Sequence, residues 1–186
     1  MESGATPLRS FEDLSVGEKF QSRWYSVSQR ELINFALEYD NQYFHVDPAR
    51  AKESPFGGII ASGAYTFAVW NKLNLEINGN IAWIAGMGFE NFTFPNPLHP
   101  DVNFKAESHL IEKRKSESDP RRGIVKHEYK VSTESGLTIF ACLCPALVHT
   151  RDALERMNVS QPHPQEQFHY HGLTRLSHEL ETPLNQ

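Results

Sequence analysis

Asp40 and His45 stand five positions apart, and their side chains can exchange protons. No helical or strand period spans residues 41–44, so we expect both residues on a loop, where a rigid scaffold can aim them into one pocket. A carboxylate and an imidazole placed in this way indicate general acid/base chemistry. The alternatives are structural: Asp40 as the boundary of a preceding helix, and His45 as a side chain satisfied by one hydrogen bond.

A glycine-containing apolar stretch, Pro55 to Trp70, follows this pair. We expect a helix from Ile59 that is apolar on all sides and therefore buried. Gly57, Gly58 and Gly63 would belong to its first turn, where the lack of a Cβ lets a ligand approach the N–H groups of a positive helix end. Such N–H groups can stabilise an oxyanion. The alternatives are close packing of Gly63 on a sheet and a bond from Ser62 back to a carbonyl.

The elements that bring the chain to Asp40 are an edge strand and a helix. We expect the strand over residues 19–27. The run from Ser28 to Glu31 has the capping-box pattern, which predicts a helix that starts at Ser28. Apolar residues follow helical spacing up to Tyr39, so this helix positions the acid. Asp47 and Pro48 predict the start of a further short helix.

Beyond residue 80 the hydrophobic period changes from 3.6 to 2, which predicts strands. The first strand region covers residues 81–94, and a loop with three prolines covers 95–100. Alternating or apolar segments at 102–110, 125–133 and 137–148 are separated by turn-forming residues. We expect three adjacent antiparallel strands, followed by a turn of helix at 151–157.

Length and charge limit the classes of protein. The chain has 186 residues and a formal net charge of -5, with no basic stripe, which argues against nucleic acid as a partner. We expect one domain over residues 1–157 and a polar tail over 158–186, either mobile or docked on a partner. The sequence shows neither a leader-like apolar region nor a run of about 20 apolar residues, so we expect a soluble, cytoplasmic protein without a membrane segment.

Metal ligation is not expected. Cys142 and Cys144 have the i, i+2 spacing of one strand face, which favours buried reduced thiols. The histidines of the tail have no regular scaffold at ligand spacing. These are His163, His169, His171 and His178.

Several motifs occur together in one register over residues 10–150. They are Phe11-Glu12-Asp13-Leu14, Gly17, Asp40-x-x-x-x-His45, Phe56-Gly57-Gly58, Ala61-Ser62-Gly63 and Phe94-x-x-Pro97-Leu98-His99-Pro100. Each motif alone is weak, but the combination is specific. On these motifs the sequence resembles the MaoC-like family of (R)-specific enoyl-CoA hydratases and acyl dehydratases.

The resemblance implies an α+β hotdog fold, in which an antiparallel sheet wraps a long buried helix, as a homodimer or a dimer of dimers. It implies reversible hydration of the 2,3 double bond of an enoyl thioester of the acyl-CoA class. Asp40 and His45 would activate water, and the Gly63 N–H would hold the thioester oxygen, with Ser62 and Gly58 beside it in the substrate site. No cofactor would be needed, because the thioester carbonyl already acidifies the α carbon. The basic residues between 113 and 126 would form a solvated face or, alternatively, bind the phosphates of CoA.

The sequence departs from the family pattern in two places. Gln42-Tyr43 replaces Asn-Pro between the acid and the base, and Asp101-Val102 replaces Gly-Asp after the proline loop. We expect the first change to affect the choice of substrate and the second to affect only a turn.

Two other functions stay open from the sequence. A hotdog thioesterase would share the fold, but such enzymes commonly carry a carboxylate on the central helix, and Ile59 to Leu73 has none. A non-catalytic acyl-CoA binding module would keep the pocket, yet it would not need the acid and the base.

Overall fold

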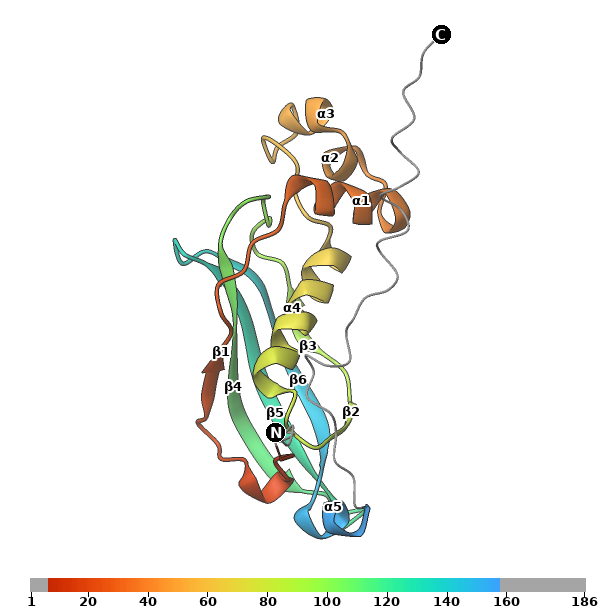
Figure 1. Ribbon diagram of the computed structural model, residues 1–186, viewed down its shortest axis with the longest axis vertical. Helices are drawn as coiled ribbons and strands as arrows, with labels where there is room; N and C mark the ends of the chain where they lie inside the picture. Colours follow the sequence, from red (N-terminus) through yellow and green to blue (C-terminus); the bar gives the residue numbers. More distant parts are fainter. Residues whose placement is uncertain (1–6, 158–186) are drawn as a thin grey trace, which may run out of the picture.

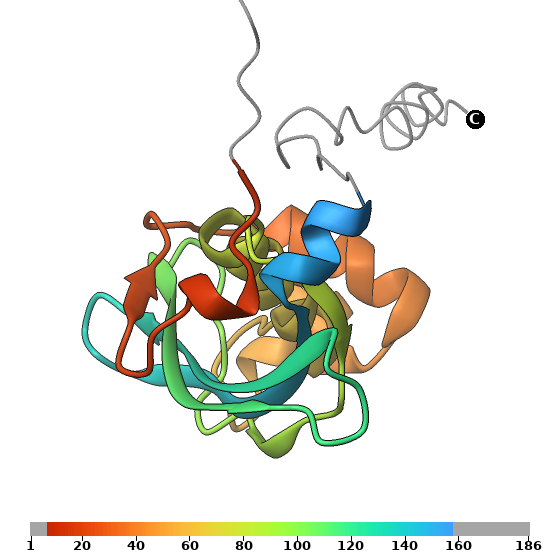
Figure 2. The same cartoon turned by 90° about the horizontal axis from the view of Figure 1, so that it is seen from below.

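A long helix, α4 (Gly63–Asn78), lies along one face of a six-stranded antiparallel sheet in the computed structural model, which describes residues 7–157 (Figure 1). The strand order is β1-β4-β5-β6-β2, and β3 also pairs with β6. Seen along the molecule, the strands curve around the helix (Figure 2). The predicted α+β hotdog fold is therefore confirmed, whereas the predicted tail at 158–186 lies outside the described residues. The strands are β1 (Lys19–Gln21), β2 (Trp83–Gly86), β3 (Glu90–Thr93), β4 (Phe104–Lys115), β5 (Arg122–Thr133) and β6 (Thr138–His149).

The core fills the space between α4 and the three long strands β4, β5 and β6. These strands pair antiparallel over most of their length, which confirms the prediction from alternating hydrophobicity. Trp70 of α4 packs its ring against Tyr129 of β5 and Phe140 of β6, at centroid distances of 5.0 and 5.2 Å. The first strand is shorter than expected: after β1 ends at Gln21, Ser22 and Tyr25 still form hydrogen bonds with Ala106 and Phe104 of β4, but no continuous strand forms.

Helix α4 begins four residues later than the sequence indicated. Ser62 is its N-cap and accepts a hydrogen bond from the Tyr65 N–H, while Ile59 to Ala61 precede the helix without regular secondary structure. The Ala61 N–H donates to the carbonyl of Leu98 at 2.8 Å. The predicted start at Ile59 was wrong because β-branched residues favour extended backbone and serine favours the cap. Gly57 and Gly58 therefore precede the helix rather than form its first turn.

The prediction that the central helix is buried on every side was also wrong, because one side of α4 is exposed in the single chain. Thr66, Val69, Trp70 and Leu73 face the sheet and are buried. Ala64 and Ala68 lie on the opposite side and are exposed. The apolar residues on that side thus have no cover within residues 7–157, although hydrophobicity alone suggested burial.

Three short helices gather over the N-terminal end of α4 (Figure 1). They are α1 (Gln29–Tyr39), α2 (Tyr43–Val46) and α3 (Pro48–Lys52). The capping box of α1 forms as predicted, since the Ser28 side chain accepts from the Glu31 N–H and the Glu31 carboxylate accepts from the Ser28 N–H. Asp47 caps α3, also as predicted. This layer carries the candidate acid and base.

The opposite end of the sheet is closed by the short 3₁₀ helix η1 (Phe11–Asp13) and by α5 (Arg151–Met157). Arg151 joins the two, since its guanidinium lies 2.6 Å from the Asp13 carboxylate.

None of the helices within residues 7–157 combines the length and the hydrophobicity needed to cross a bilayer.

Candidate active site

The candidate acid and base come from the end of one helix and the middle of the next. Asp40 is the C-cap of α1, and His45 lies on the one-turn helix α2. The loop predicted for this segment was wrong at His45, because the Gln42 carbonyl accepts from the N–H groups of His45 and Val46 and so starts a helical turn. Four residues are too few to show a helical period in the sequence. The fold brings the His45 Nε2 to 3.6 Å from Asp40 Oδ2.

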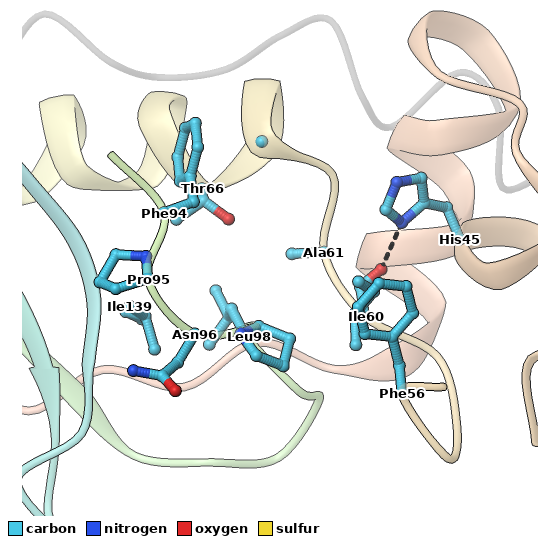
Figure 3. A pocket seen from close by; sticks show the side chains of 12 residues that line it. His45, Phe56, Ile60, Ala61, Thr66, Phe94, Pro95, Asn96, Leu98 and Ile139 are labelled. Atoms are coloured by element: carbon cyan, nitrogen blue, oxygen red, sulfur yellow. Dashed lines mark hydrogen bonds between the residues drawn. The ribbon is translucent and has the colours of Figure 1, made fainter. Parts of the chain in front are cut away.

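The second nitrogen of the imidazole fixes the tautomer of His45. His45 is 4% exposed, and its Nδ1 lies 2.8 Å from the backbone carbonyl of Ile60 (Figure 3). A carbonyl oxygen can only accept, so Nδ1 must carry the proton. In the neutral ring Nε2 then presents a lone pair towards Asp40. Two acceptors 3.6 Å apart leave a place for a molecule that donates hydrogen bonds to both.

A cavity of about 310 Å³ opens beside His45. Its wall is mostly apolar and comes from five parts of the chain (Figure 3): α2, the segment before α4, the first turn of α4, the proline loop after β3, and β6. The lining residues are His45, Phe56, Ile60, Ala61, Gly63, Thr66, Phe94, Pro95, Asn96, Pro97, Leu98 and Ile139. A mostly apolar cleft with one titratable group at its side suits a small ligand that has an apolar portion and a reactive polar portion.

Gly63 is the first residue of α4 and lines the cavity. Among residues 7–157, no acceptor binds its N–H group, which is one of the free donors at the positive end of a helix. A Cβ at this position would lie 3.1 Å from the Phe94 ring, so the absence of a side chain keeps the N–H accessible beside that ring. Gly63 thus borders the cavity with an N–H left free by the described residues, and its oxyanion role stays a prediction.

Ser62 and Gly58 do not line the cavity. The Ser62 hydroxyl is buried and accepts from the Tyr65 N–H at 3.1 Å, which is a capping contact rather than a bond back to a carbonyl. A Cβ on Gly58 would meet nothing within 4 Å. Of the five predicted site residues, only His45 and Gly63 line the cavity, and Asp40 lies outside its wall as a neighbour of the His45 ring.

The sequence analysis named several residues of the cavity wall in its motifs but assigned a site role only to His45 and Gly63 among them. Pro95 and Asn96 belong to a loop that was recognised by its prolines, Phe94 was assigned to the preceding strand although β3 ends at Thr93, and Ile139 comes from the start of a strand assigned to the core. The Asn96 side chain donates to the Thr138 carbonyl at 2.8 Å and so ties the loop to β6. No pattern in the sequence indicates this long-range contact.

Several of the basic residues between 113 and 126 contact other groups of the protein. Lys126 lies 2.7 Å from the Glu90 carboxylate, and Arg121 forms an ion pair with Asp119. Lys113 donates to the backbone carbonyl of Leu14. These contacts favour the predicted solvated face over a phosphate site.

Metal ligands do not gather in the described part of the chain: no three side chains of His, Cys, Asp or Glu lie close enough together to hold an ion. Cys142 and Cys144 are both free thiols on β6. Burial raises the pKa of the Cys142 thiol to about 12, so this thiol stays protonated at neutral pH.

Comparison with known proteins gives consistent matches. The model of the MaoC like domain matches residues 12–133. The structure of the MaoC-like dehydratase from Rhodospirillum rubrum superposes with a TM-score of 0.72 at 32% identity, over 77% of this chain and 98% of that one. The 3-hydroxyacyl-thioester dehydratase Z of Mycobacterium tuberculosis (strain ATCC 25618 / H37Rv) is 33% identical over 113 residues, which cover 56% of this chain and 75% of that protein.

The uncharacterized protein YdeM of Bacillus subtilis (strain 168) is 38% identical over 92 residues, 48% of this chain. The match spans 64% of the length of YdeM.

Proposed function

Because the chain belongs to the MaoC like domain family, we propose that it is a hydratase or dehydratase that acts reversibly on the 2,3 double bond of an enoyl thioester, of the acyl-CoA class. The observation that carries the proposal is the pair of acceptors, Asp40 Oδ2 and the lone pair of His45 Nε2, held 3.6 Å apart, with His45 lining an apolar cavity. The name of the mycobacterial relative, a 3-hydroxyacyl-thioester dehydratase, agrees with this substrate class.

In the proposed mechanism one water molecule lies between the pair. It donates one hydrogen bond to Asp40 and the other to His45, which leaves an oxygen lone pair free to attack C3 of the substrate. One group of the pair accepts the proton that the water loses. The pair returns one proton to C2, so that one water is added across the double bond and the pair regains its initial protonation state.

The negative charge of the addition develops on the thioester oxygen. The Gly63 N–H is unoccupied by other described residues and lines the same cavity as His45, so it is suited to stabilise that oxygen as an enolate forms. The apolar wall formed by Leu98, Ile139 and Phe94 would hold the acyl chain. No metal or redox cofactor takes part in this mechanism.

The experiment that tests the proposal follows the absorbance of the enoyl-thioester bond with enoyl-CoA substrates of several chain lengths. Asp40→Asn keeps the shape of the side chain but removes its charge, and His45→Gln removes the titrating ring. Each should lower turnover by roughly 100-fold or more, in line with general acid/base contributions, while substrate binding weakens much less. His109→Gln, which replaces a histidine of β4 beside Glu128, is the matched control and should retain turnover.

The two alternatives predict different outcomes. A thioesterase would release free CoA in a thiol assay, and this release would survive in Asp40→Asn and His45→Gln. The only carboxylate of α4, Glu76, lies near the far end of the helix from Gly63 and pairs with Arg23, which disfavours hydrolysis at the cavity. A binding module would bind acyl-CoA without turnover in the unmutated protein.

We also propose that the protein forms a homodimer or a dimer of dimers. All residues of strand β3 are exposed. Phe92 in the strand, and Phe89 and Phe94 at its two ends, are exposed aromatic side chains. An exposed apolar edge strand of this kind usually needs cover. Light scattering at micromolar concentration should give at least twice the monomer mass, and a monomer would contradict the proposal.

A further inference from the structure

Gln42 differs from the Asn that the resemblance leads one to expect, and the proposed chemistry assigns it no role. It lies between the acid and the base in the sequence and is the N-cap of α2. Its side chain makes no capping hydrogen bond to that helix. Instead, the Gln42 Nε2 donates to Asp40 Oδ1 at 2.8 Å.

The orientation of the amide follows from its partner. Were the amide reversed, its oxygen would face the carboxylate oxygen at 2.8 Å, and two acceptors would oppose each other. The nitrogen must therefore face Asp40. A hydrogen bond to an ionised acceptor is stronger than one between neutral groups, so this contact can fix the carboxylate against rotation.

The backbone of Gln42 links the same two residues. Its N–H donates to the Asp40 carbonyl at 2.8 Å, and its own carbonyl accepts from the His45 N–H at 2.8 Å. The side chain thus orients Asp40, while the carbonyl starts the turn that carries His45. With Oδ1 engaged by Gln42, it is Oδ2 that faces the imidazole at 3.6 Å.

We propose that Gln42 is a positioning residue that holds the Asp40 carboxylate with Oδ2 directed at His45 and at the water between them. This inference rests on the proposed hydratase function, which it deepens. Gln42 acts through Asp40, so its loss should lower kcat and leave KM nearly unchanged.

The test compares three substitutions in the full-length chain with an enoyl-CoA substrate. Gln42→Ala removes the donor, and kcat should fall about 10-fold, less than for loss of Asp40 itself. Gln42→Asn keeps a primary amide and should recover part of that loss. Asn41→Ala is the matched control, because Asn41 is exposed in the same turn and its side chain makes no hydrogen bond among the described residues.

Gln42→Glu gives a signature in the pH profile. The new side chain has the same shape, but its ionised form places a second carboxylate against Asp40 and repels it. Its protonated form can donate a hydrogen bond as the amide does. The kcat of Gln42→Glu relative to the unmutated protein should therefore rise as pH falls from 8 to 5. A ratio independent of pH would overturn the inference, as would an unchanged kcat in Gln42→Ala.

A measurement without turnover separates this inference from the proposed function. At a fixed pH, the Cε1–H resonance of His45 should move in Gln42→Ala in the same direction as in Asp40→Asn, because both changes disturb the carboxylate beside the ring. An unmoved resonance in Gln42→Ala contradicts the positioning role whatever the activity. A moved resonance in a protein without hydratase turnover would support the positioning role and reject the proposed function.

Discussion

A buried imidazole makes the stability of this fold depend on pH. His127 of β5 is 3% exposed, stacks on the Tyr129 ring at 5.5 Å, and has no partner for Nδ1 among the described residues. Burial lowers the pKa of His127 to about 4, mainly because the charged ring would lose its hydration. The unfolded chain keeps an ordinary pKa of about 6.5 at this position.

The sign of the effect follows from these two values. Well above pH 6.5 both states hold the neutral ring, and protonation of His127 contributes nothing to the free energy of unfolding. As pH falls from about 6.5 towards 4, the His127 ring is protonated in the unfolded chain but stays neutral in the folded protein. The free energy of unfolding therefore decreases. Between pH 7.5 and 5.5 this contribution amounts to about 1 kcal/mol.

Urea unfolding of the unmutated protein and of His127→Phe at both pH values tests this reasoning. Phenylalanine keeps a ring against Tyr129 but cannot be protonated, so His127→Phe should lose about 1 kcal/mol less than the unmutated protein between the two pH values. Tyr129→Phe, which alters the same stack but keeps His127, should lose as much as the unmutated protein. An equal loss in His127→Phe and the unmutated protein would refute the argument.

Three further predictions concern the site. Gly63→Ala should lower turnover about 10-fold while the fold persists, because the new Cβ meets the half-exposed Phe94 ring at 3.1 Å and crowds the oxyanion position; unchanged turnover would move the oxyanion role to another amide. The double variant of Asp40→Asn and His45→Gln should be little slower than either single variant, since the two act on one water; multiplied losses in kcat would show independent roles. Removing residues 158–186 should leave kcat unchanged, because the cavity wall that residues 7–157 form extends no further along the chain than Ile139; a large loss would show that this segment completes the site.

Local sequence signals predicted most of the fold. The capping box at Ser28 and the Asp47-Pro48 pair each gave a helix start that the structure confirms. The alternation of β4 and β5 was equally clear, because each has one face on the core. The start of α4 was misread, since the apolar run continues across Ser62 and hydrophobicity alone does not separate an extended segment from a helix.

The site was only partly predictable, because it depends on contacts between distant segments. Asp40 and His45 could be selected from their types and spacing, but the tautomer of His45 depends on the carbonyl of Ile60, fifteen residues away. The side chain of Gln42 turns away from the helix that it caps, which no local pattern indicates. Asp101, where the family pattern has glycine, adopts a φ of 60°, so the turn is retained with a residue that tolerates this conformation less well.

The central claim is that Asp40 and His45 act together on a water molecule that adds to an enoyl thioester. The most direct test is the rate of hydration of an enoyl-CoA by the unmutated protein and by Asp40→Asn, followed by the loss of the enoyl-thioester absorbance. We expect measurable turnover in the first and a rate lower by roughly 100-fold or more in the second, with similar substrate binding. Full hydratase activity in Asp40→Asn would contradict the assignment.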